Sequence, residues 1–229
     1  KTTSLFAFTL VFTAGMAFGQ SNDATVDQDG DDHEAAIEQV GSLNDGSVNQ
    51  DGTGGFATID QMGVQNEASI TQSDAGDTDA SILQDGEENE ASTFQEKSNF
   101  KTSEVEQIGD GNLATVISEG GGRSDAADIF QTGNDNVASI DQTLTSASSA
   151  EIFQTGNDNM ASVDNYGGPL NALIDQDGNE NTASIDDGAS VLGSGGNTAD
   201  IFQTGDFNDA SILTTGNGST STIDQLGNS

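Results

Sequence analysis

The sequence predicts an all-β fold, a parallel β-solenoid in which about nine two-stranded coils form two facing parallel sheets. Three observations predict it. A motif recurs every 22 to 24 residues with one longer interval, apolar and polar residues alternate on both sides of it, and turn-forming residues recur about every 11 residues. A fixed repeat near this length is typical of solenoids, and such frequent turn residues argue against helices.

The composition of the 229-residue chain argues against an ordinary globular enzyme. Thirty-nine acidic residues stand against four Lys and Arg, giving a formal net charge of −35, with 29 Gly, no Cys, no Trp and one His. Such a chain cannot bind nucleic acid by neutralising phosphates, and it repels anionic membranes. Low hydrophobicity with high charge is also typical of disorder, so order has to be inferred from pattern.

The first twenty residues, KTTSLFAFTLVFTAGMAFGQ, differ from the rest of the chain. They contain one Lys, an apolar stretch from Leu5 to Phe12, and then small residues. This pattern predicts a secretory signal peptide over residues 1–19 and a short mature segment over residues 20–23. The alternative is a membrane anchor, but the apolar stretch is too short to span a bilayer comfortably. We expect no membrane span in the mature chain. Without cysteine, a secreted protein must be stabilised by something other than disulfides.

Residues 24–229 carry the repeat, in which Gln, then Gly two residues later, then Asn three residues further recur together. The glutamines are Gln39, Gln61, Gln84, Gln107, Gln131, Gln154, Gln176, Gln203 and Gln225. The glycines are Gly41, Gly63, Gly86, Gly109, Gly133, Gly156, Gly178, Gly205 and Gly227. The asparagines are Asn44, Asn66, Asn89, Asn112, Asn136, Asn159, Asn181 and Asn208. The ninth copy ends before its Asn.

Each repeat contains two strand-like halves, one before the Gln and one after the Asn. Both alternate with period two, as in Ala150–Gln154 and Ala161–Val163, which indicates strands. Aligned copies give one apolar row of Ile37, Ile59, Ile82, Val105, Ile129, Ile152, Ile174, Ile201 and Ile223. A second row comprises Val48, Ile70, Val116, Ile140, Val163, Ile185 and Ile212, with Thr93 as the exception. These rows and the accompanying Ala predict a thin core.

The motif residues receive structural roles from this geometry. Gln points inward, where a buried amide must be hydrogen-bonded, and stacked identical amides can bond along their column. Gly supplies a backbone conformation that other residues resist. Asn can bond the backbone of the turn or extend a second amide ladder. If Gln and Asn were merely polar loop residues, they would not keep the same positions over nine copies. The other turn of each coil varies and contains the only proline, Pro169, and its longest copy, Gly188 to Thr198, accounts for the long interval.

The pattern Ser/Ala-x-x-x-Gln-x-Gly-x-x-Asn-x-Ala-x-x-x-Gln resembles the curlin repeat of curli amyloid subunits, over roughly residues 24 to 227. The resemblance implies an amyloid-like solenoid that is secreted by a bacterium. It implies self-assembly into extracellular functional amyloid fibres at the cell surface, for biofilm matrix and adhesion. The implied partners are other copies of the chain, a nucleator subunit and the outer-membrane curli secretion machinery. The Gln and Asn columns would be the amyloid ladders.

The chain departs from the family pattern at the end of the second strand. Gln is retained there at Gln28, Gln50, Gln72, Gln95 and Gln142. It is replaced by Ser118, Asn165, Asp187 and Thr214. The chain also has more repeats than is usual and is strongly acidic. Whether it is the major subunit or the nucleator stays open.

The open ends and the outward faces indicate how assembly would proceed. A solenoid without caps exposes strand edges that template pairing with another copy, giving a filament. Outward residues form a hydroxyl row (Ser47, Ser69, Ser92, Thr115, Ser139, Ser162, Ser184 and Ser211) and an acidic row (Asp141, Asp164 and Asp186). Stacked carboxylates repel, so we expect assembly to accelerate at low pH or with divalent cations. Phe130, Phe153 and Phe202 also point outward, either for lateral bundling or to cover the sheet.

Three rival functions can be weighed against self-assembly. An enzyme would need clustered acid–base groups, whereas His33, Lys97, Lys101 and Arg123 lie on variable turns. The oxygen-rich TGND and DQDGNEN segments could bind calcium weakly, but the calcium-binding β-roll has a nine-residue repeat. We therefore expect no catalytic residue, no cofactor and no dedicated metal site. A monomeric secreted β-solenoid that binds ice or another surface is the alternative function.

Overall fold

The computed structural model describes residues 21–97, 100–120, 125–145, 147–188, 196–216 and 218–227. The predicted signal peptide, residues 1–19, lies outside them, and so does Arg123. The described residues contain eighteen strands and no helix. Sheet A consists of β1 (Asp23–Asp31), β3 (Asp45–Thr53), β5 (Glu67–Gly76), β7 (Glu90–Glu96), β9 (Leu113–Glu119), β11 (Val137–Thr143), β13 (Met160–Tyr166), β15 (Thr182–Gly188) and β17 (Asp209–Thr214).

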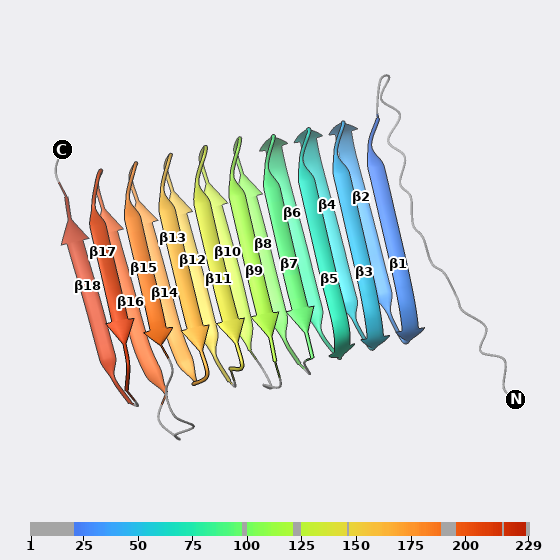
Figure 1. Ribbon diagram of the computed structural model, residues 1–229. Helices are drawn as coiled ribbons and strands as arrows, with labels where there is room; N and C mark the ends of the chain where they lie inside the picture. Colours follow the sequence, from blue (N-terminus) through green and yellow to red (C-terminus); the bar gives the residue numbers. More distant parts are fainter. Residues whose placement is uncertain are drawn as a thin grey trace, which may run out of the picture.

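Sheet B holds the even-numbered strands, so the chain alternates between the two sheets. It consists of β2 (Glu34–Ser42), β4 (Phe56–Val64), β6 (Asp79–Glu87), β8 (Thr102–Ile108), β10 (Ala126–Thr132), β12 (Ser149–Thr155), β14 (Leu170–Asp177), β16 (Asn197–Thr204) and β18 (Thr220–Leu226). Every strand pairs in parallel with the strand two positions along the chain, so each coil stacks directly on its neighbour. The layers run from β1 at one end to β18 at the other (Figure 1). The predicted fold is confirmed.

The core is a thin layer of Ala, Ile and Val between the sheets. Both predicted apolar rows are in it: Ile129 and Ile152 are fully buried, and Thr93 takes its place in the second row. Most of these residues have a buried alanine two positions earlier, such as Ala127 before Ile129, whereas Gly46 and Ser103 take that place before Val48 and Val105. Because Ala is short, the sheets approach closely, and in-register pairing stacks Ile129 on Ile152. Each buried Ile stabilises the fold by roughly 1.5–3 kcal/mol.

The two ends of the core are less buried than its middle. Inward residues of β1 and β18 are only half-buried, because no further coil among the described residues covers them. Val26, which is not in either predicted apolar row, and Ile223 pack against the core from these end coils. Within the described residues, the outer edges of β1 and β18 are therefore unpaired.

Candidate functional site: stacked arcs and open ends

The predicted glutamine column forms a continuous ladder of hydrogen bonds through sheet B. The Nε2 of each Gln donates to the Oε1 of the Gln in the next coil, at 2.8–2.9 Å, from Gln39 to Gln225. Each Nε2 also donates to a backbone carbonyl of sheet A, at 2.8–3.1 Å. Both donors of each amide from Gln39 to Gln203 are thus satisfied, and Gln225 keeps the bond to the backbone. The ladder joins successive coils and ties the two sheets together.

The asparagine column bonds both the backbone and its own neighbours. The backbone N–H of each Asn donates to the Oδ1 of the Asn one coil earlier, at 2.9–3.1 Å. From Asn44 to Asn181 the side-chain Nδ2 donates to the carbonyl of the motif glycine one coil later, at 2.6–3.2 Å. Both roles that the sequence left open for Asn occur.

The motif glycines are required by backbone conformation and by close stacking. From Gly41 to Gly205 their φ values lie between +99° and +142°, a region that L side chains rarely adopt. A Cβ on any of these eight glycines would also collide with the carbonyl oxygen of the next glycine in the stack. Gly227, in the last coil, does not show this positive φ.

The sequence analysis missed two groups of residues in and around the turn that contains the motif Gly and Asn. Asn22 is the first member of the asparagine ladder, since its Oδ1 accepts from Asn44 N at 3.0 Å. The signal was its position, 22 residues before Asn44. A third ladder uses the residue after the glycine, whose side-chain oxygen accepts from the backbone N–H one coil earlier at 2.9–3.0 Å. Its members are Asp110, Asn134, Asn157, Asn179 and Asp206. The recurring Gly-Asn and Gly-Asp pairs were the signal.

The second glutamine column, in sheet A, is interrupted. Gln28, Gln50, Gln72 and Gln95 form a ladder with distances of 2.7–3.0 Å. It stops at Ser118, and three buried atoms in successive coils have no hydrogen-bond partner within the described residues: Ser118 Oγ, Gln142 Oε1 and Asn165 Oδ1. In the next coil, the Asp187 carboxylate accepts a hydrogen bond from Asn197 Nδ2 at 3.0 Å. It accepts another from the hydroxyl of Thr214, which lies in the last coil, at 2.6 Å. The variable-turn side of the core is thus less completely bonded.

The basic side chains of the described residues, Lys97, Lys101 and His33, lie between strands. Buried Lys101 lies 3.9 Å from buried Asp125, and burial lowers the pKa of its ammonium. Lys97 pairs with Glu96 at the surface, at 2.6 Å. His33 Nδ1 accepts from Gly55 N at 3.1 Å. In the part of the chain that the structure describes, no group of three or more His or acidic residues could hold a metal ion. Nor is there a helix there that could span a bilayer.

The outward rows follow the predicted register. Ser47 and Ser69 are hydrogen-bonded at 3.2 Å within the hydroxyl row. In the acidic row of sheet A, burial and the neighbouring carboxylates raise the pKa of Asp164. The rings of Phe130 and Phe153 stack with centroids 5.0 Å apart and planes 8° apart. Phe202 is not part of this stack, because Asp175 of β14 lies between it and Phe153.

This arrangement defines a class: a parallel β-solenoid stabilised by stacked amide ladders, whose first and last described strands have unpaired outer edges. Sequence comparison identifies the family. The curlin associated repeat matches residues 19–52, 56–86, 122–156 and 196–227, more than half of the chain. The chain belongs to the curlin-repeat family, whose members are structural and form extracellular fibres. A search of curated proteins found no match.

Proposed function

We propose that this chain is a secreted structural subunit that polymerises end to end into an extracellular curli-type amyloid fibre. The observation that carries the proposal is the match between its two ends. The last coil repeats the Ile, Gln and Gly of the first at the same positions, with Thr214 in place of Gln28, and both have half-buried inward residues. A second copy can therefore continue both sheets and cover this surface. The contact joins different ends of the chain and stacks each copy along the same axis as the coils, so it generates an open filament.

The junction can be specified residue by residue by extending the internal pairing. In sheet B, β18 would pair with β2 of the next copy, placing Ile223 on Ile37 and Gln225 on Gln39. Internally, each Gln donates to the next one, so Gln225 Nε2 would donate to Gln39 Oε1 across the junction. In sheet A, β17 would pair with β1.

The asparagine ladder would also continue across this junction. Asn208 Oδ1 would accept from the backbone N–H of Asn22 in the next copy, as Asn22 Oδ1 accepts from Asn44 inside the chain. The same pairing places Asp224 beside Glu38 of the next copy. Two carboxylates at strand spacing repel, so low pH or a divalent cation would favour the junction.

A proline at the C-terminal end provides the test. Thr198 N donates to Ser219 O of the following strand, and alternate residues of a parallel strand donate to the same neighbour. Thr222 is therefore expected to direct its N–H away from β16, toward the outer edge of β18, where no further coil of the described chain lies. Thr222→Pro removes this donor without removing an internal ladder bond, and Thr222→Ala keeps it.

Both variants and the parent chain, each starting at Gln20, would be followed by thioflavin fluorescence and fibre diffraction. We expect the parent and Thr222→Ala to form fibres with a cross-β spacing of about 4.7 Å. Thr222→Pro should stay folded by circular dichroism but fail to elongate, and small amounts should cap fibres of the parent. Elongation of Thr222→Pro at the parent rate would refute this junction. A parent chain that remains monomeric would favour the alternative, a monomeric surface-binding solenoid.

The remaining family roles enter as part of this proposal. A signal peptide over residues 1–19 would direct the chain to secretion, and the domain over residues 24–229 would be exported by an outer-membrane curli secretion system. A nucleator subunit would present an end coil to the first copy, unless this chain is itself the nucleator. Biofilm matrix and adhesion follow from a fibre at the cell surface. No step requires catalysis or a cofactor.

A further inference from the structure

The outer face of sheet B has no cation of its own to neutralise its carboxylates. None of the eighteen strands of the described chain contains Lys, Arg or His. Three carboxylates nevertheless stack on adjacent strands, because Asp128 of β10 pairs in register with Glu104 of β8 and Glu151 of β12. Any positive charge that balances this row must come from outside the strands.

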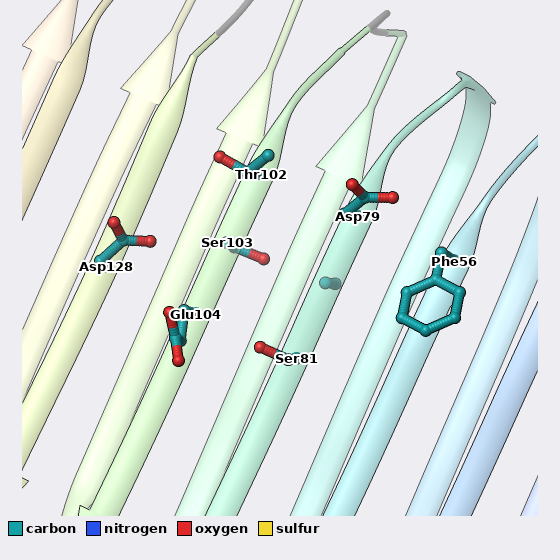
Figure 2. Close-up of a pocket in the computed structure, with 8 residues that line it drawn as sticks. Phe56, Asp79, Ser81, Thr102, Ser103, Glu104 and Asp128 are labelled. Carbon is teal, nitrogen blue, oxygen red and sulfur yellow. The ribbon is translucent and has the colours of Figure 1, made fainter.

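The same face contains a groove that leads to these carboxylates. One hollow of about 310 Å³ spans β4 to β10, and Figure 2 shows Phe56, Asp79, Ser81, Glu104 and Asp128 spread across it. A second hollow of about 390 Å³ spans β2 to β8 and shares Ser81 and Glu104 with the first. Together they form what we call the axial groove, which runs across the strands and so along the solenoid axis.

The floor and the walls of the axial groove differ in chemistry. The floor is open because small outward residues follow one another in register, from Ala36 to Thr58 to Ser81. One wall carries Asp60 and Leu83, which provide a carboxylate and an apolar surface side by side. This combination suits a narrow chain that alternates methylene groups with positive charges.

An aromatic pair lies on the same face, close to the last strand of the groove. The stacked rings of Phe130 and Phe153 lie two residues beyond Asp128 and Glu151 on the same outward face. An ammonium group held by these carboxylates can also contact a ring, which adds a cation–π attraction. Acidic, apolar and aromatic side chains therefore lie near one another on this face.

We propose that the axial groove and the adjoining Phe130–Phe153 stack form a docking surface for a linear oligoamine. Its ammonium groups pair with Asp60, Glu104 and Asp128, and its methylene segments lie over the small floor residues. The ligand is an extended amine because the carboxylates are arranged in lines along the axis. In the described part of the chain they are not gathered into a group able to hold a metal ion. Because the surface is lateral, docking does not depend on the polymerisation proposed above.

Protonation of Asp128 gives the proposal a second signature. Burial, followed by repulsion from Glu104 and then Glu151, raises the pKa of Asp128 to about 6. The hollow also contains Asp79. Below pH 6 the Asp128 carboxyl becomes neutral, so an oligoamine should bind more weakly at pH 5 than at pH 8.

The test uses spermine, titrated calorimetrically into freshly purified chain and into sedimented fibres at constant ionic strength. Asp128→Asn should weaken binding about fivefold, the size expected for one partly exposed ion pair, and should reduce the difference between pH 5 and pH 8. Asp164→Asn is the matched control, because Asp164 is the middle of a similar acidic row on sheet A. It removes the same charge from the opposite face and should leave binding unchanged.

Three results would overturn the proposal: equal loss in the two variants, spermine binding no stronger than that of sodium at matched ionic strength, or binding of oligolysine without binding of spermine. Failure of the chain to form fibres would not affect the measurement on the monomer. Loss of this docking and loss of polymerisation are therefore distinguishable.

Discussion

Gln154→Glu is expected to destabilise the solenoid strongly at neutral pH. Gln154 is buried at the centre of the sheet B ladder, where its Nε2 donates to Gln176 Oε1 at 2.9 Å and to Val137 O at 3.1 Å. Glutamate has the same shape but, when ionised, has no hydrogen to donate. Two hydrogen bonds are lost and two buried acceptors are left without a donor. At about 1–3 kcal/mol for each unsatisfied group, the free energy of unfolding should fall by about 2–6 kcal/mol.

The pH dependence of this variant identifies the cause. Burial beside two acceptors raises the pKa of the new carboxyl above the ordinary Glu value of about 4.3. The part of the penalty caused by ionisation is therefore absent below about pH 4.3 and grows as the pH rises from there through the folded-state pKa. The protonated carboxyl restores only one of the two donors, so a smaller loss persists at low pH. Urea unfolding followed by circular dichroism at pH 4 and pH 7 measures it. Gln225→Glu is the control, because the last ladder position is half-exposed. A loss of unfolding free energy below about 0.5 kcal/mol for Gln154→Glu at pH 7 would refute the conclusion that the ladder stabilises the fold by joining the coils and the two sheets.

Three further outcomes follow from the same contacts. Ser118→Gln should extend the interrupted ladder of sheet A to Gln142, whose Oε1 has no partner among the described residues. The free energy of unfolding, measured by urea titration, should rise by about 1 kcal/mol. A decrease would show that the site cannot accommodate the larger side chain. Gly156→Ala should prevent soluble folding, judged by circular dichroism, because its φ is +115° and a Cβ would strike the next coil. Lowering the pH through 6 should stabilise the chain and accelerate fibre growth, because the raised pKa values of Asp128 and Asp164 mean that repulsion is relieved on protonation. Equal growth rates at pH 4 and pH 8 at fixed salt would contradict this last expectation.

The strand rows and the glutamine register could be predicted because one repeat determines all others. A side chain at a fixed motif position must stack on its equivalents, so the contacts of Gln131 follow from those of Gln107. Asn22 was missed because the motif was aligned on glutamine, which is absent five residues before it. The break at Ser118 was visible as a substitution. That it leaves Gln142 Oε1 unpaired depends on side-chain geometry, which the repeat does not encode.

The axial groove lay beyond sequence reasoning for a related reason. It depends on the relative sizes of outward residues on five neighbouring strands, such as Ser81 beside Glu104, and outward positions vary from coil to coil. The stack of Phe130 and Phe153 could have been inferred from their equivalent positions. Their separation from Phe202 could likewise have been inferred by aligning Asp175.

The junction between copies should be weaker than the contacts between coils of one copy. In sheet B, Gln225 meets Gln39 and the amide ladder continues. In sheet A, Thr214 would meet Gln28, and the Thr214 hydroxyl already donates to Asp187 at 2.6 Å, so no donor remains for the amide. Fibres should therefore dissociate into folded subunits before the subunits unfold.

Thr214→Gln places an amide at this position and should slow depolymerisation in dilute urea, with the released chain still folded by circular dichroism. The gain of one hydrogen bond, about 1 kcal/mol, corresponds to roughly fivefold slower release. The variant also removes the hydroxyl bond to Asp187, so monomer stability must be measured alongside. If release is unchanged while the monomer remains stable, Thr214 does not lie at the junction, and the pairing of β17 with β1 of the next copy is wrong.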